Sequence, residues 1–381
     1  MRSALKRSLA LLCIGLAATA CAGRGTPPPA PLFPLSPVWR VEVTDYVVPP
    51  LATDARRLYV ATRDGSVTAF DLVSGTPYWT IEDRPGRLTA IRGRLLLREA
   101  DGTVWSLKPR DGTPRWTTET GVAGDLPAVL DGDRLYVAGN GLAALDVETG
   151  RVLWTHGTVS EVTAPPVPTT ARLLTGEADG TLYCRDRATG LPLWAHRTSG
   201  PLVAPPLVDE KRRRVYLGTT ERSIREVKLD KGQKGWAWRV GADIQSPGLL
   251  LPDQVLFASF DAVLYGLTRG GNLAWRTALP SRPLSGPLQV EGHIIIACHE
   301  NEILGFHLDT GESAGTLRTD AQIRTPPLVE GGRIFVGLRN RTVVAFALPP
   351  RLPAGSAPTP PPGTPPTPPP GGPPETPPAG R

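Results

Sequence analysis

The sequence is poor in the residue patterns that build metal, redox and hydrolytic centres. It has four cysteines, and none forms a C-x-x-C motif or an adjacent pair, so neither a zinc site nor a dithiol redox centre is indicated. The H-E-x-x-H, G-x-S-x-G and D-x-D-x-D-G motifs are also missing. We therefore expect no catalytic residue, no bound metal and no cofactor.

Long apolar runs are scarce as well. Arg2, Lys6 and Arg7 precede an apolar stretch from Leu9 to Ala18, and small residues follow up to Cys21. The stretch is about half of the roughly 20 residues that a transmembrane helix needs. Residues 1–20 are therefore predicted to be a secretory signal peptide rather than a spanning anchor.

The end of this signal resembles a bacterial lipobox, through Ala18, Thr19, Ala20 and Cys21. The resemblance implies that Cys21 is lipidated, with palmitate-type acyl chains as a membrane anchor. Ala18 stands where lipoboxes usually have leucine, so cleavage by ordinary signal peptidase is the alternative. The residue after the cysteine is Ala22 and not aspartate, which implies the periplasmic face of the outer membrane.

Net charge alone would suggest nucleic acid as a partner, since the formal charge is +6 and the isoelectric point about 9.3. Most of the excess lies in the signal and in the ends of the chain. We interpret the remaining body as nearly neutral and without a basic run, and expect no nucleic-acid partner.

Two segments are too rich in proline to be folded domains. Residues 22–37 hold six prolines and residues 349–381 hold sixteen. Proline prevents ladder hydrogen bonds and favours extended chain. We predict a lipidated cysteine and linker at 21–37 and a disordered tail at 349–381, with an aromatic-groove ligand as the tail's alternative role.

A repeat of about 40 residues fills the rest of the chain. Six units carry a glycine followed four residues later by tryptophan, and successive tryptophans are 37 to 42 residues apart. The repeat tryptophans are Trp39, Trp79, Trp116, Trp154, Trp194, Trp236 and Trp275. Gly311 keeps the register, with Gly315 at the next tryptophan position. Such a period is typical of propellers and solenoids, in which these residues pack between units.

The amino-acid sequence of each unit predicts four antiparallel strands. A proline opens most units, and Asp-Gly or Asn-Gly pairs such as Asp64-Gly65 and Asp179-Gly180 mark tight hairpins. Seven units are complete, and the eighth ends after three strands. We predict an all-β, eight-bladed propeller over 38–348, closed by an N-terminal strand that carries Trp39.

The motif D-x-x-[ST]-G-x-x-x-W occurs at Asp71 to Trp79, Asp146 to Trp154 and Asp186 to Trp194. It resembles the PQQ-type propeller repeat, which is found in dehydrogenases and in scaffolds. The dehydrogenases typically hold the quinone near adjacent cysteines and a calcium ion. Here Cys184 and Cys298 lie in different repeats, so we expect two buried thiols and no enzyme.

An exported lipoprotein that consists of little more than this propeller is similar to the BamB family. That resemblance implies a monomeric, non-catalytic scaffold that docks on a BamA-like protein and assists outer-membrane protein insertion. Two alternatives stay open, a propeller lipoprotein of another envelope complex and a PQQ-binding periplasmic oxidoreductase.

The loops that join one unit to the next are the places where a partner could bind. We predict that they share one face with the Asp-Gly hairpins, at Glu82 to Arg87, Glu119 to Asp125, Ser160 to Thr163 and Ser281 to Ser285. His156 and His196 follow their tryptophans at equivalent positions, which indicates a repeat feature and not a shared metal site.

Overall fold

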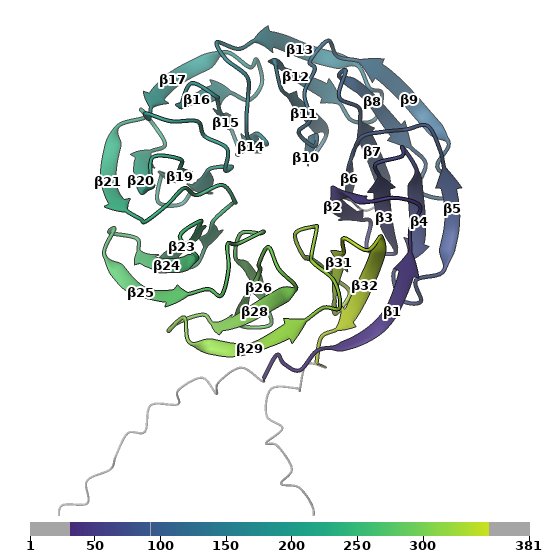
Figure 1. Ribbon diagram of the computed structural model, residues 1–381. Coiled ribbons are helices and arrows are strands. Elements are labelled where there is room, and N and C mark those ends of the chain that lie inside the picture. Colours follow the sequence, from purple (N-terminus) through teal and green to yellow (C-terminus); the bar gives the residue numbers. More distant parts are fainter. Residues whose placement is uncertain (1–30, 92, 350–381) are drawn as a thin grey trace, which may run out of the picture.

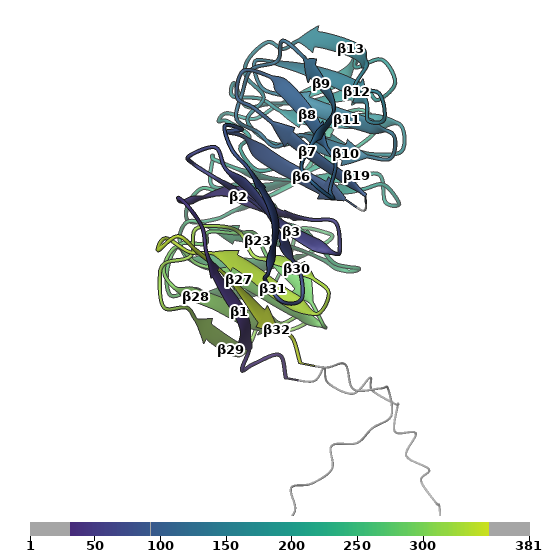
Figure 2. The same cartoon turned by 90° about the vertical axis from the view of Figure 1, so that its right-hand side faces the viewer.

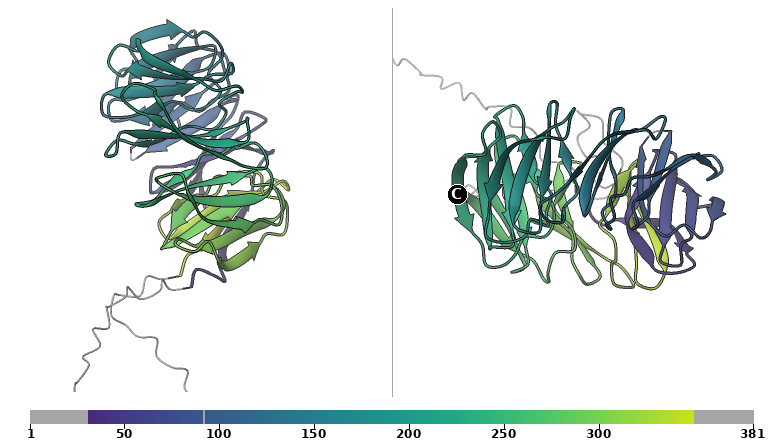
Figure 3. Two further views of the ribbon diagram at one scale, coloured as in Figure 1. Left: turned by 90° about the vertical axis from the view of Figure 1, so that its left-hand side faces the viewer. Right: turned by 90° about the horizontal axis from the view of Figure 1, so that it is seen from above.

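The fold is a closed ring of eight blades. The computed structural model describes residues 31–91 and 93–349, and these form eight four-stranded antiparallel sheets around a central channel (Figure 1). Figure 2 and Figure 3 show the ring from its edges, with all blades in one layer. The predicted eight-bladed propeller is confirmed.

Each blade runs from an inner strand at the channel to an outer strand at the rim. Blades one to four are β2 (Val47–Thr53), β3 (Arg57–Thr62), β4 (Val67–Asp71), β5 (Pro77–Ile81); β6 (Arg87–Ile91), β7 (Arg94–Arg98), β8 (Thr103–Leu107), β9 (Pro114–Glu119); β10 (Val129–Asp131), β11 (Arg134–Ala138), β12 (Gly141–Asp146), β13 (Val152–Gly157); β14 (Val167–Pro168), β15 (Arg172–Gly176), β16 (Thr181–Asp186), β17 (Pro192–Arg197).

The second half of the ring repeats the pattern until the last blade. Blades five to eight are β18 (Leu207–Asp209), β19 (Arg214–Thr219), β20 (Ser223–Lys228), β21 (Lys234–Arg239); β22 (Leu249–Leu250), β23 (Gln254–Ser259), β24 (Val263–Thr268), β25 (Leu273–Ala278); β26 (Leu288–Val290), β27 (His293–Ala297), β28 (Glu302–His307), β29 (Ser313–Arg318); β30 (Leu328–Glu330), β31 (Arg333–Gly337), β32 (Thr342–Ala347) and β1 (Ser36–Glu42).

Blade eight contains both ends of the described chain. Strand β1 pairs antiparallel with β32, so that Arg40 lies opposite Val344, in a sheet of order β1-β32-β31-β30. In Figure 1 the purple β1 lies against the yellow β32. The N-terminal strand therefore closes the ring, as predicted, and leaves no open blade.

The burial of the strands follows their place in the blade. The second strand is buried on both faces, as in β3, whereas the outer strand alternates between exposed and half-buried residues, as in β9. The hairpin between the second and third strands often needs a left-handed residue, and Gly65 (φ 88°) and Gly180 (φ 84°) supply it. The inner strand is short and usually begins just after a proline such as Pro206, where a missing N-H costs little.

The repeat tryptophans lie in the seams between blades. A Cβ atom added at Gly112 of blade two would approach the Trp79 ring of blade one to 2.9 Å, and Gly190 stands in the same relation to Trp154. The indole N-H also donates across the seam, as from Trp79 to the Pro109 carbonyl (3.0 Å). Corresponding bonds run from Trp39, Trp116, Trp194 and Trp236 to the next blade. The contacts explain why glycine and tryptophan recur together.

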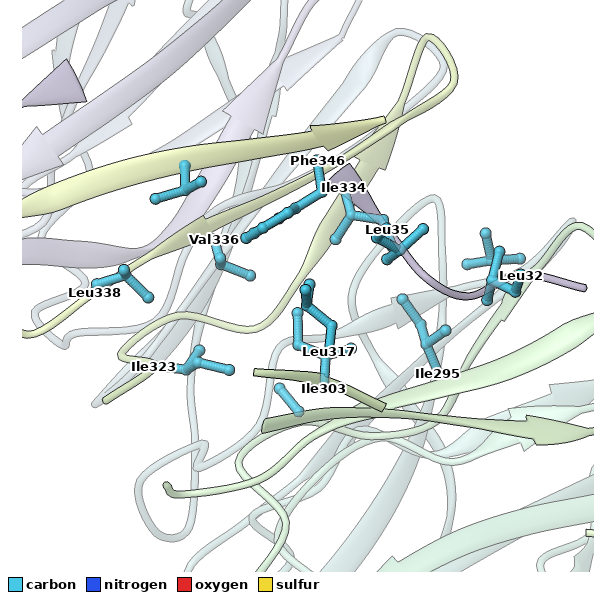
Figure 4. Close-up of a cluster of buried hydrophobic side chains, with 13 residues drawn as sticks. Leu32, Leu35, Ile295, Ile303, Leu317, Ile323, Ile334, Val336, Leu338 and Phe346 are labelled. Atoms are coloured by element: carbon cyan, nitrogen blue, oxygen red, sulfur yellow. The ribbon is translucent and has the colours of Figure 1, made fainter. Parts of the chain in front are cut away.

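Apolar side chains fill every seam as well. The seam between blades seven and eight holds Ile295, Ile303 and Phe346 together with Leu32 and Leu35 from the segment before β1 (Figure 4). Leu32 is 1% exposed and Leu35 6% exposed. The chain therefore packs into the ring from Leu32, six residues before the predicted boundary at residue 38.

Candidate docking face

The two faces of the ring are built from different turns. One face, the hairpin face, carries the turn between the second and third strand of each blade and the loops that join neighbouring blades. The opposite face carries the other two turns of each blade. On the hairpin face Arg84 N-H donates to Gly65 O (2.8 Å) and Ala178 N-H to Glu161 O (2.8 Å), each joining a loop to a hairpin. The predicted sharing of one face is thus confirmed for these loops.

A hollow of about 510 Å³ opens on the hairpin face where blades eight, one and two meet. Its charged lining residues are Arg63, Arg87, Arg324, Glu99, Asp101 and Asp125. The remaining lining comes from small, apolar and hydroxyl residues such as Val48, Pro49 and Thr62. The hollow can therefore accept a polar chain segment that carries charge of either sign.

Two guanidinium groups at this hollow lie against one aromatic ring. The Cζ atoms of Arg63 and Arg324 are 5.0 and 5.2 Å from the centroid of the Tyr46 ring, within cation–π range. Arg63 also pairs with Asp45 at 3.3 Å, and Arg324 donates from Nε to Val47 O at 2.9 Å. Tyr46 thus holds positive charge from blades one and eight together, an arrangement that the sequence alone did not indicate.

Buried arginine supports the far wall of the hollow. Arg87 forms an ion pair with Asp125 and donates to Pro49 O, which ties blades one, two and three together. Beneath it Arg98 is 2% exposed and donates to Val122 O at 3.0 Å. Burial lowers the pKa of Arg98 to about 10, although the charge of Asp125 opposes this, so Arg98 stays protonated at neutral pH.

A second feature of the hairpin face is an exposed valine. Val159 is 76% exposed, in the loop between blades three and four. The next residue fixes the loop, because Ser160 N-H donates to Glu177 Oε2 at 3.1 Å. Glu177 is itself buried and paired with buried Arg185 at 3.2 Å. Burial raises the pKa of Glu177, whereas the Ser160 N-H and Arg185 favour its charged form. The loop therefore presents an apolar residue from a fixed position.

The two cysteines considered as candidates for a redox site lie in different blades. Cys184 and Cys298 are buried free thiols in blades four and seven, and burial raises the pKa of each to about 11, so neither is a reactive thiolate at neutral pH. Cys184 lies opposite Trp194, a position where other blades have small residues such as Ala69. Cys21 lies outside the described residues.

The paired histidines hold neighbouring blades. His156 Nε2 donates to Thr189 O at 2.7 Å and His196 Nδ1 to Gly232 O at 2.9 Å, each across a seam. They belong to the repeat, as predicted. Within residues 31–91 and 93–349 no three His, Cys, Asp or Glu side chains are grouped to hold a metal ion. No helix in the same part of the chain is long and apolar enough to span a membrane.

The fold and its loop-bearing face place the chain among the eight-bladed propellers built from tryptophan-bearing four-stranded repeats. A family model described as outer membrane protein assembly factor BamB matches residues 36–99, 100–236 and 139–263. Because these segments cover more than half of the sequence, the chain belongs to this family. No curated protein sequence matches the chain.

Solved structures share the fold at low sequence identity. BamB from Moraxella catarrhalis superimposes with a TM-score of 0.68 at 18% identity, covering 82% of this chain and 100% of that one. The computationally designed protein Ika8 gives 0.70 at 15%, covering 81% and 98%. Quinohemoprotein alcohol dehydrogenase from Comamonas testosteroni gives 0.66 at 12%, covering 85% and 78%. These similarities show that the ring architecture is shared, and they do not show what this protein does.

Proposed function

We propose that this protein is a non-catalytic scaffold lipoprotein of the outer membrane. It is anchored through Cys21 and faces the periplasm as a monomeric ring. It binds a partner of the β-barrel assembly machinery and assists the insertion of outer-membrane proteins. Membership of the BamB family over residues 36–263 is the observation that carries this proposal.

The hairpin face is the proposed docking surface. It combines an exposed apolar anchor, Val159, with a charged hollow beside Tyr46, and interfaces are typically built from a few apolar anchors within a polar rim. The loop carrying Val159 is fixed by Glu177, so little conformational entropy is lost when a partner binds it.

Crosslinking in intact cells tests the partner. The lipidated protein is purified from membranes after crosslinking, and the captured proteins are identified by mass spectrometry. We expect a barrel-insertion protein of the BamA type among them. Capture of cytochromes or a bound quinone in its place would overturn the assembly role and favour the alternative hypothesis of a PQQ-binding oxidoreductase.

The anchor has its own test. Mass spectrometry of the mature N-terminus is expected to find diacylglycerol on Cys21, and Cys21→Ala is expected to release the protein from membranes. An unmodified N-terminus produced by ordinary signal peptidase would contradict the anchor and leave the ring and its partner to be judged separately.

A further inference from the structure

Blade five gathers the lysines of this protein. Four of its six lysines are Lys211, Lys228, Lys231 and Lys234, and they constitute what we call the lysine patch. Lys211 also begins four consecutive basic residues that end at Arg214. The interpretation of the body as lacking a basic run is therefore wrong, because here one exists and the fold brings further lysines to it.

Two turns on the opposite face bring these residues together. The turn between β18 and β19 contributes Lys211, and the turn between β20 and β21 contributes Lys231. Leu229 N-H donates to Arg213 O at 3.1 Å, which joins the two turns, and Lys228 lies opposite Arg214 in the ladder. All four lysines are exposed.

The arginines beside the patch already have acidic partners. Arg213 pairs with Asp230, and Arg214 pairs with Glu226 at 3.1 Å. Within the described residues, the structure shows no hydrogen bond or ion pair for the side chains of the four lysines. Arginine thus takes up Asp230 and Glu226, and Glu210 beside Lys211 accepts from Thr170 N-H. The four lysines of the patch are exposed and form no ion pair in the described part of the chain.

Exposed leucines lie on the neighbouring blade. Leu191 and Leu193 are each 54% exposed, at the start of the outer strand of blade four. The same strand carries Trp194, which packs on Gly232 between two of the patch lysines. Exposed positive charge beside exposed leucine is the combination that membrane-surface segments use.

The patch is on the face from which the chain ends leave the ring. Ala347, at the end of β32, lies opposite Ser36 of β1 and opposite Arg333 of β31. Arg333 follows the turn between β30 and β31, which belongs to the opposite face. Only ten residues separate Cys21 from Leu32, a reach of at most about 40 Å. On the proposed anchoring through Cys21, this tether keeps the ring close to the membrane.

We propose that the lysine patch, with Leu191 and Leu193, is a membrane-contact surface that binds anionic phospholipid headgroups. Lysine is a hydrated point charge on a flexible stem and suits a laterally mobile layer of phosphates. A carboxylate-bearing protein partner would more often be met by the planar fork of arginine. Binding here would complement the acyl chains and set which face of the ring is turned to the periplasm.

Vesicle sedimentation tests this surface without the anchor. The chain from residue 22, which retains every described residue, is mixed with vesicles of phosphatidylcholine alone or with 30% phosphatidylglycerol. The patch variant replaces Lys211, Lys228, Lys231 and Lys234 by Gln. The matched control replaces Arg222, Arg282, Arg339 and Arg341 by Gln, which removes the same charge from exposed positions on the hairpin face. Circular dichroism checks that both variants are folded.

We expect binding only to the anionic vesicles, weakening as salt rises, and at least about a tenfold loss of partitioning in the patch variant. The control is expected to lose much less. Equal losses in the two variants, or no binding to anionic vesicles at low salt, would overturn the proposal. Lysine-directed crosslinks from the patch to a protein, found in the separate crosslinking of intact cells, would also overturn it. Because this assay contains neither partner nor acyl chain, its failure leaves the scaffold function untouched.

Discussion

Phe33 lies directly against Gly315, in the place where the other seams of the ring hold a tryptophan from the preceding blade. A Cβ atom added at Gly315 would approach the Phe33 Cβ to 2.7 Å, and one at Gly305 would clash with the Phe33 ring. Blade seven has lost its own tryptophan, and the segment before β1 supplies the aromatic group. The ring is thus closed by two devices, the strand β1 and the side chain of Phe33.

Replacing Phe33 by alanine is expected to lower the free energy of unfolding by about 2 kcal/mol, because the half-buried ring leaves a void against Gly305 and Gly315. Urea denaturation measures the change. Val38→Ala is the control, since Val38 is 44% exposed, and it is expected to change stability by less than about 0.5 kcal/mol. Equal effects would mean that the lead-in segment does not seal the seam.

A comparison of two tryptophans distinguishes the contribution of packing to stability from that of the indole hydrogen bond. Trp79 donates its indole N-H to Pro109 O, whereas Trp154 Nε1 has no partner in the described structure. Substitution by phenylalanine removes similar apolar area at both positions. Trp79→Phe is therefore expected to cost about 1 kcal/mol more than Trp154→Phe in equilibrium unfolding. The reverse order would contradict the assigned bond.

The buried pair of Glu177 and Arg185 gives a third prediction. Glu177→Gln leaves Arg185, which is 4% exposed, without a counter-charge and is expected to destabilise the ring by about 3 kcal/mol. Glu161→Gln changes an exposed carboxylate of the same loop and serves as the control. Chemical denaturation of both variants measures the two changes in the free energy of unfolding. A loss of less than about 1 kcal/mol for Glu177→Gln would show that the pair is dispensable.

Stability is expected to depend on pH through His293. Its ring is 1% exposed and 5.4 Å from that of His307. Burial lowers the pKa of His293, the hydrogen bond with Glu291 O opposes this, and the charge of His307 adds to the lowering. The unfolded chain therefore binds this proton first, at its ordinary pKa of about 6.5. The contribution of neutral His293 is complete above that pH and declines as the pH falls below it.

His293→Phe is expected to flatten the dependence of unfolding free energy on pH between 7 and 5, measured by denaturant titration. His299→Phe, at an exposed position on the hairpin face, is expected to leave the slope as it is in the wild type. An unchanged slope in the His293 variant would assign the acid sensitivity to another group.

Partner capture is expected to depend on Val159. Val159→Asp introduces a charge at the proposed apolar anchor and should reduce crosslinked partner about tenfold. Val73→Asp is the matched control, because Val73 is 59% exposed but lies in a turn of the opposite face. Quantitative mass spectrometry of the captured partner compares the two. A larger loss for Val73→Asp would move the docking surface to the opposite face.

The sequence by itself determined the repeat, the number of blades and the closure of the ring. Those properties depend on local signals that recur in phase, namely the hairpin glycine, the outer-strand tryptophan and the proline before the inner strand. Trp39 was enough to indicate that an N-terminal strand completes blade eight, and the pairing of β1 with β32 agrees.

Only the tertiary structure decided which distant residues meet. Leu32 and Phe33 lie in a proline-rich stretch for which the sequence predicts a linker. In the structure they fill a seam in which Gly315 stands at the tryptophan position and has no side chain to fill the space. Tyr46 meets Arg324 because the ring closes. The turns that carry Lys211 and Lys231 lie side by side because Leu229 N-H donates to Arg213 O. Such contacts depend on the three-dimensional arrangement of chain segments that are far apart in sequence, which periodicity does not encode.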